Sequence, residues 1–166
     1  IPPELGSLAQ VNYFYLNNNG LTGTVPPELG SLSDVGTLYL YNNELTGPVP
    51  RELGSCSVAF LQIHNNQLDG PIPPELGSLR KVKRIFLHNN ELAGTVPPEL
   101  GSLQVVEDLN LLSNQLTGPI PPQLGSLKTV QSVQLHNNRF SGPLPLELGS
   151  MGSLNVLFLH DTQAGL

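Results

Sequence analysis

The stretch from residue 35 to residue 55 reads Val-Gly-Thr-Leu-Tyr-Leu-Tyr-Asn-Asn-Glu-Leu-Thr-Gly-Pro-Val-Pro-Arg-Glu-Leu-Gly-Ser, and its pattern returns along all 166 residues. The closing Leu-Gly-Ser recurs seven times, at steps of 24, 24, 23, 24, 24 and 24 residues. A period of about 20–50 residues indicates a solenoid, because one unit cannot bury its own apolar edge and must stack on its neighbours. We therefore expect one repeat domain over residues 1–166, with about seven repeats of 24 residues (one of 23) and both ends falling inside a repeat.

Each unit divides into a strand and a tight turn. Leu38 and Leu40 alternate with Thr37, Tyr39 and Tyr41, and this period of two predicts a strand with one buried side. The following Pro-Glu-Leu-Gly-Ser phrase, with apolar residues spaced by three, predicts a short 3₁₀-like turn. Stacked units then place their strands in one parallel sheet on one side of the solenoid and the proline-rich turns on the other.

The units share the consensus V/L-x-x-L-x-L-x-x-N-x-L-x-G-x-I/V-P, as in Val35, Leu38, Leu40, Asn43 and Leu45. The chain thereby resembles the leucine-rich repeat family, in its plant-type subclass found in receptor-like kinase ectodomains. The resemblance implies an α/β solenoid, a right-handed superhelix with a concave parallel β-sheet and short 3₁₀ or helical turns on the convex side. The paired-cysteine caps common on extracellular members are missing from both ends.

Composition excludes several classes of protein. Only 12% of residues are charged and 39% are hydrophobic, which is unlike a disordered chain. The net charge of −6 argues against a nucleic-acid partner, since such proteins carry a basic surface. No run approaches the roughly 20 apolar residues of a membrane span, so this segment is not expected to insert into a membrane. Cys56, the single cysteine, stands in a leucine column and is expected to be a buried thiol.

One asparagine follows the inward leucines of each unit, where the chain must bend. Its amide can satisfy backbone groups of the turn, which buried polar groups require. The asparagine just before it, such as Asn89, is expected to be exposed and to contribute little stability. We predict the structural role for Asn19, Asn43, Asn66, Asn90, Asn114 and Asn138.

The outward positions of the strands carry most of the aromatic residues. Of nine Phe and Tyr residues, only Phe14 and Phe140 occupy inward positions. Folding does not require the other seven on a solvent-facing sheet, whereas exposed aromatic groups commonly mark binding surfaces. We predict a partner-binding face made of Tyr13, Tyr15, Tyr39, Tyr41, Phe60, His64, Phe86, His88 and Phe158, centred near the N-terminal end.

All four histidines fall in one outward column, with His64 next to His88 and His136 next to His160 on adjacent strands. Two such imidazoles can share a metal or sense pH. The favoured interpretation is that the phrase His-Asn-Asn was copied with the repeat, so no metal and no cofactor is predicted. Arg84 and Asp108 also share a column and are expected to form an exposed ion pair.

A recognition module is the function that these features favour. The sequence has no Gly-x-Ser-x-Gly, no phosphate-binding loop and no pair of carboxylates on the sheet, so we expect no enzyme activity. The resemblance implies a protein or peptide partner and a longer parent chain. Two alternatives remain: an ice- or polysaccharide-binding solenoid, with an incomplete column of Thr22, Thr46 and Thr117, and a purely structural spacer.

Location follows from the same resemblance, which favours the extracellular space or the cell surface. The missing cysteine caps and the absence of any Asn-x-Ser/Thr acceptor leave a cytoplasmic location open.

Overall fold

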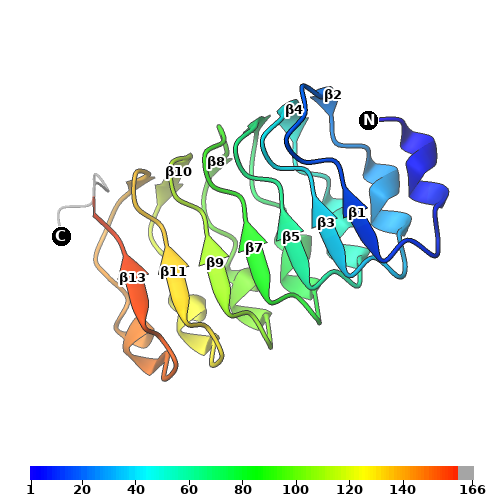
Figure 1. The fold of residues 1–166 in the computed structure, drawn as a ribbon. Helices are drawn as coiled ribbons and strands as arrows, with labels where there is room; N and C mark the ends of the chain where they lie inside the picture. The colour runs from blue at the N-terminus through cyan, green and yellow to red at the C-terminus, as the bar shows by residue number, and fades with distance from the viewer. Residues whose placement is uncertain (161–166) are drawn as a thin grey trace.

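The computed structural model describes residues 1–160; the final part of the expected domain, residues 161–166, lies outside the described residues. The described chain winds through seven similar coils stacked side by side, as Figure 1 shows. One strand from each coil joins a seven-stranded parallel sheet in sequence order. These strands are β1 (Tyr13–Tyr15), β3 (Thr37–Tyr39), β5 (Phe60–Gln62), β7 (Arg84–Phe86), β9 (Asp108–Asn110), β11 (Ser132–Gln134) and β13 (Val156–Phe158).

Short 3₁₀ helices lie away from this sheet, along the lower side of the solenoid in Figure 1. Each begins after a proline in extended conformation, and five of the seven carry a further proline in the first turn, where its missing N–H costs nothing. The predicted solenoid with a parallel sheet and 3₁₀ turns is confirmed. The helices are η1 (Pro3–Ser7), η2 (Pro27–Ser31), η3 (Arg51–Ser55), η4 (Pro74–Ser78), η5 (Pro98–Ser102), η6 (Pro122–Ser126) and η7 (Leu146–Ser150).

Two further parallel sheets, which the sequence analysis did not predict, cover the upper flank in Figure 1. Their pairing advances by 22 or 21 residues between β2, β4 and β6, so Thr46 lies opposite Thr24 rather than Thr22. The threonine column expected from the 24-residue period is therefore not aligned across these strands. The flank strands are β2 (Thr22–Thr24), β4 (Glu44–Pro48) and β6 (Gln67–Asp69) in one sheet, and β8 (Ala93–Gly94), β10 (Gln115–Gly118) and β12 (Arg139–Phe140) in the other.

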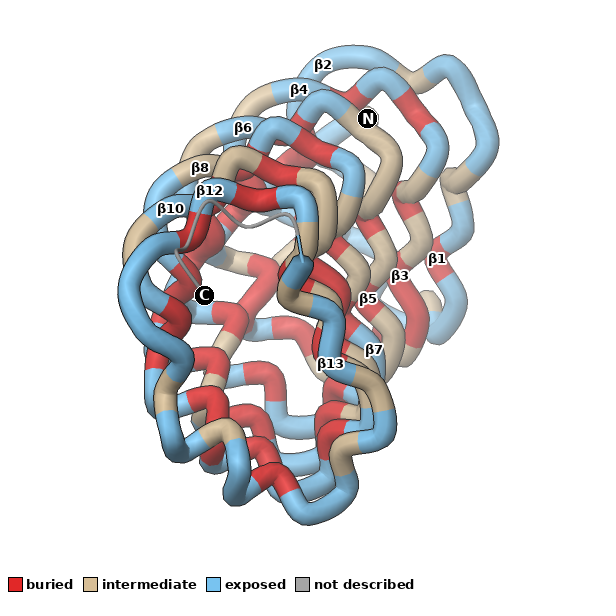
Figure 2. Tube along the Cα trace, turned by 90° about the vertical axis from the view of Figure 1, so that its left-hand side faces the viewer, coloured by how far each residue is buried: buried red, intermediate tan, exposed pale blue. Residues whose placement is uncertain are grey.

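The core is a continuous column of aliphatic side chains inside the coils. Figure 2 looks along the solenoid, and the buried positions recur at the same places in successive turns. Leu38, Leu61 and Ile85 occupy matched positions on β3, β5 and β7 and are fully buried. Each unit thus covers the apolar edge of the preceding one. Within residues 1–160, no helix has the length and apolar character needed to cross a membrane.

The inner asparagines join neighbouring coils. The Asn90 Oδ1 atom accepts a hydrogen bond from the Leu68 N–H at 3.0 Å, in the preceding unit. Its Nδ2 donates to the carbonyl oxygens of Leu87 at 3.0 Å and Ile63 at 3.2 Å. Asn19 differs, because its amide is exposed and donates only to carbonyls of its own turn. The same bonding to the preceding unit is made by Asn43, Asn66, Asn114 and Asn138.

A second asparagine ladder runs along the outside of this bend. Asn42 donates from Nδ2 to Asn18 Oδ1, Asn65 to Asn42, and Asn89 to Asn65, each at 2.6 Å. These residues also adopt the left-handed conformation, with Asn89 at φ 53°. Asparagine tolerates that conformation better than most residues. Asn89 is exposed, as expected, but its side chain bonds Asn65 and its backbone is left-handed, so the prediction that it contributes little has to be tested against both features.

Candidate functional site

The outward side of the seven-stranded sheet, called the concave face below, carries the predicted partner-binding residues. Two columns run across it from strand to strand. The Tyr39 column consists of Tyr15, Tyr39, Gln62, Phe86, Asn110, Gln134 and Phe158. The His64 column follows the strand ends and consists of Asn17, Tyr41, His64, His88, Leu112, His136 and His160.

Aromatic rings in the N-terminal half touch one another in a continuous series. Tyr15 stacks on Tyr39 with ring centroids 4.9 Å apart and an interplanar angle of 13°. Tyr39 contacts Tyr41 at 5.6 Å, and Tyr41 stacks on His64 at 4.6 Å. His64 in turn stacks on His88 at 4.2 Å. The series therefore passes from the Tyr39 column to the His64 column at the contact between Tyr39 and Tyr41, within the unit of β3.

The series is open at its N-terminal end. Tyr13 is 71% exposed and Tyr15 is 54% exposed, and their rings lie 6.0 Å apart at a tilt of 54°. At the other end, Phe86 contacts both His64 and His88 with its ring steeply inclined to theirs. A surface of this kind offers large rigid aromatic area at low entropy cost on binding.

A second ring cluster lies at the C-terminal end of the sheet. His136 and His160 stack at 4.4 Å, and Phe158 lies 5.5 Å from His136 and 5.9 Å from His160. Asn110 and Leu112 occupy the intervening unit, so this cluster is separated from the N-terminal series. Phe158 thus does not join the other eight predicted residues in one group.

The charges on the concave face are paired. Arg84 Nε lies 2.9 Å from Asp108 Oδ2, as expected from their shared column. The guanidinium carbon also lies 5.6 Å from the centroid of the Phe60 ring, a cation–π arrangement. The residues that directly precede them, Lys83 and Glu107, form a second ion pair at 3.2 Å. Phe60 therefore contributes to the site by packing against the guanidinium group of Arg84.

Burial changes the protonation of several side chains. It lowers the pKa of His64 from its ordinary 6.5 to about 4, with a further contribution from neighbouring His88. Burial also lowers the pKa of His88. The pKa of Tyr39 is raised by burial and by Tyr15 and Tyr41, against the influence of Arg84. These groups are therefore uncharged near neutral pH.

The geometry of the histidine pair does not suit a shared metal ion. The His64 and His88 rings are inclined by only 15°, so their nitrogen lone pairs run nearly parallel and do not converge. Within residues 1–160, no three His, Cys, Asp or Glu side chains are grouped to hold a metal. Cys56 lies in the core, donates a hydrogen bond to the Leu29 carbonyl at 3.4 Å, and has its pKa raised by burial to about 11.

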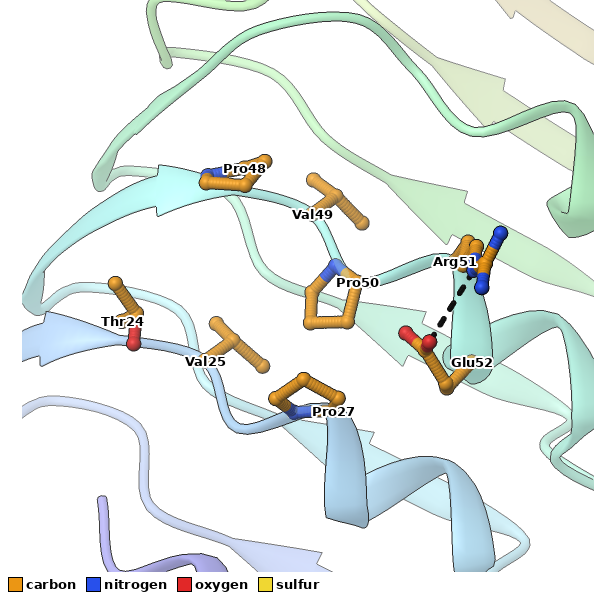
Figure 3. A pocket seen from close by; sticks show the side chains of 8 residues that line it. All are labelled: Thr24, Val25, Pro27, Pro48, Val49, Pro50, Arg51 and Glu52. Carbon is orange, nitrogen blue, oxygen red and sulfur yellow. Dashed lines mark hydrogen bonds and ion pairs between the residues drawn. The ribbon is translucent and has the colours of Figure 1, made fainter.

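A groove of about 400 Å³ lies on the flank, away from the concave face (Figure 3). Valine and proline side chains from two neighbouring units form most of its walls, and an ion pair between Arg51 and Glu52 stands at its edge. A similar groove of about 270 Å³ recurs three units later. Both begin at a threonine, Thr24 or Thr95, where most units have proline.

Two features of the face escaped sequence reasoning. Thr37, in an outward position, is only 5% exposed and lies in register between Tyr13 and Phe60 of the adjacent strands. Gln62 lies between Tyr39 and Phe86 in the sheet register, and its side chain makes no hydrogen bond within residues 1–160. Its place in the Tyr39 column was readable from the repeat, but its lack of a partner was not.

Comparison with known proteins places this geometry in a family. The leucine-rich repeat family model matches residues 10–32, 35–56, 57–79, 81–103, 106–127 and 129–151. A search of the curated proteins gives no match.

Solved structures with the same fold include receptors and an ice-binding protein. The GASSHO1/SCHENGEN3 receptor kinase ectodomain from Arabidopsis thaliana, solved with CASPARIAN STRIP INTEGRITY FACTOR 2, is 36% identical with a TM-score of 0.97. The plant peptide hormone receptor RGFR1, solved with RGF2, is 30% identical with a TM-score of 0.92. A plant ice-binding protein is 28% identical with a TM-score of 0.86.

In each comparison the matched region makes up a much larger share of this chain than of the other chain. All three cover 99% of this chain, but this chain covers only 20%, 26% and 53% of theirs. The similarity therefore concerns a run of repeats within longer molecules. Because the family model matches most of the residues, the chain belongs to the leucine-rich repeat family.

Proposed function

We propose that the chain is a non-catalytic recognition module that binds a peptide across the N-terminal half of its concave face. The observation that carries this proposal is the unbroken ring series from Tyr13 through Tyr39 to His88. Its rings are held by mutual contact, so little side-chain freedom is lost on binding. The neighbouring receptors GASSHO1/SCHENGEN3 and RGFR1 were solved with CASPARIAN STRIP INTEGRITY FACTOR 2 and RGF2, which supports a peptide ligand here as well.

The test begins with a defined probe. A phage-displayed library of random dodecapeptides is selected on the immobilised protein, and the leading peptide is synthesised and titrated by calorimetry. Tyr39→Ala and Tyr41→Ala are expected to weaken its binding at least about tenfold, because truncation of a central aromatic anchor commonly costs about 2 kcal/mol. The melting temperature is expected to change by only a few degrees.

Matched controls lie on the opposite side. Glu75 and Glu99 are exposed residues of η4 and η5, and Glu75→Ala and Glu99→Ala are expected to leave the affinity unchanged. If these changes reduced binding and the tyrosine changes did not, the convex side would be the binding face and the proposal would fail.

Ice binding is the second candidate because of its structural neighbour. The plant ice-binding protein covers 99% of this chain, and the first flank strand, Thr22–Thr24, is exposed throughout. However, Thr22 and Thr46 are not opposite each other in the sheet, so a regular threonine array is lacking there. A thermal-hysteresis measurement decides the matter, and we expect no hysteresis above that of an albumin control.

A further inference from the structure

Gln62 follows Tyr39 in the Tyr39 column, directly after the point where the ring series passes to the His64 column. Tyr39 and Phe86 occupy the same register on the two adjacent strands, and Phe60 and His64 lie two residues away on either side along its own chain. Residues two apart on a strand point to the same side of the sheet. The half-buried carboxamide therefore lies among four aromatic side chains.

Of the three carboxamides in the Tyr39 column, that of Gln62 makes no hydrogen bond to the described protein. Asn110, also in the Tyr39 column, accepts a hydrogen bond from the Leu112 N–H at 3.2 Å. Gln134 donates to the Ser132 hydroxyl at 3.4 Å. Among residues 1–160, no protein group bonds the side chain of Gln62. Its donor and acceptor are thus available at the centre of the aromatic surface.

The Tyr39 ring, next to Gln62, has one stacked partner, Tyr15, and one tilted contact, with Tyr41 of its own unit at 5.6 Å. Tyr39 stacks on Tyr15 from the β1 side, at an angle of 13°. Its opposite face is turned toward β5, where Gln62 lies in register. A planar group over Gln62 can therefore contact the Tyr39 ring and hydrogen-bond with the carboxamide at once.

The charge around this position further restricts the occupant. Arg84, the cation of the adjacent strand β7, is paired with Asp108 and lies over the Phe60 ring. His64 stays uncharged near neutral pH. An uncharged planar group with both a donor and an acceptor, such as a peptide group or a carboxamide side chain, is the complement of these surroundings.

We propose that Gln62 is the polar anchor of the concave face, pairing with a peptide group or carboxamide of the ligand while Tyr39 packs against its plane. This inference rests on the proposed peptide-binding function.

The test uses the dodecapeptide selected on the wild-type protein and the substitution Gln62→Leu. This change keeps the approximate size but removes donor and acceptor, so a ligand group is left unpaired, and we expect binding to weaken about tenfold. Gln62→Glu keeps an acceptor and loses the donor, and it is expected to weaken binding similarly. Neither change removes an internal hydrogen bond, so the melting temperature is expected to stay within a few degrees.

Gln134→Leu is the matched control in the same column, three units further along. It lies outside the N-terminal ring series, so we expect no change in affinity. If Tyr39→Ala weakens binding and Gln62→Leu does not, the Gln62 inference is wrong and the peptide-binding face stands. If neither change matters, or if the protein binds oligosaccharides on a glycan array but selects no peptide, both proposals are overturned.

Discussion

The imidazole rings of His64 and His88 lie face to face, with centroids 4.2 Å apart and planes inclined by 15°. Nδ1 of each ring is buried without a hydrogen-bond partner in the described chain. A protonated imidazole carries N–H groups at both nitrogens, so protonation would bury an unpaired donor in each ring. The unpaired donors act in the same direction as burial, which lowers the pKa of His64 to about 4 and lowers that of His88.

Acid is expected to destabilise the protein partly through this pair. The folded pKa of His64, about 4, lies below the unfolded value of 6.5, so the unfolded chain binds more protons between these values. The corresponding stability is present above about pH 6.5 and is lost as the pH falls toward 4, by at most about 3 kcal/mol. Urea unfolding at a series of pH values measures the loss.

The variant His64→Phe separates this effect from the titration of carboxylates. Phenylalanine keeps a flat ring between Tyr41 and His88 but takes up no proton. Its stability is expected to fall less than that of the wild type over the same pH range. Superimposable pH profiles for the two proteins would contradict the assignment.

Zinc provides a second test of the histidine column. Because the paired rings are nearly parallel and no third ligand joins them within residues 1–160, we expect Zn²⁺ to leave the melting temperature unchanged at neutral pH. A ligand that binds the folded state must raise its stability. A zinc-dependent increase that disappears in His88→Ala would show that the column binds metal after all.

The two asparagines of one bend are expected to respond differently to substitution. Asn90→Ala removes bonds to Leu68, Ile63 and Leu87 and should cost about 1–3 kcal/mol for each buried group left unpaired. Asn89→Ala leaves a residue without asparagine's short polar side chain in the left-handed region, where such residues cost about 1–2 kcal/mol, and also loses the bond to Asn65. Denaturant melts measure both losses.

Glycine at position 89 tests the backbone contribution separately. Asn89→Gly also loses the side-chain bond, but glycine adopts positive φ without strain. It should therefore be more stable than Asn89→Ala. Equal melting curves for these two variants would mean that the left-handed backbone contributes nothing at this bend.

Close packing between the 3₁₀ helices makes Gly54 sensitive to any side chain. A Cβ at this position would overlap the Glu75 carbonyl of the next unit, which is backbone and cannot turn aside. We expect Gly54→Ala to cost about 3 kcal/mol, at the upper end for an overpacked site. At Gly152 an added Cβ meets nothing within 4 Å, so Gly152→Ala should be nearly neutral. Comparable losses at both positions would refute the packing explanation.

The repeat period was sufficient to predict the main sheet but not the flank sheets. Alternation of Leu38 and Leu40 with outward residues marks β3 in the sequence, because one side of that strand is buried. Thr22, Gly23 and Thr24 form β2 with all three residues exposed, so no pattern of burial identifies that strand. Its formation depends on hydrogen bonds to β4, which the sequence does not reveal.

The site was predictable to a similar degree. Column position identified Tyr39, Tyr41 and His64 as neighbours on one face, since a fixed period makes equivalent residues adjacent. It did not predict that the rings pass contact from one column to the other. That contact depends on Gln62, which interrupts the rings of the Tyr39 column, and on the side-chain rotamers around it, which are determined by packing.

The outer asparagine ladder gives the solenoid a direction of its own. The amides of Asn89, Asn65 and Asn42 each donate toward the N-terminal unit, and Asn18 is the last acceptor, so the dipoles of these side chains add, and hydrogen bonds in such chains strengthen one another. Ser113 interrupts the sequence of amides, and Asn137 bonds to its hydroxyl instead. The units are consequently not interchangeable: duplicating the coil that contains Asn65 would extend the polarised chain by one amide, whereas duplicating the coil that contains Ser113 would leave that chain unchanged and only widen the gap before Asn137.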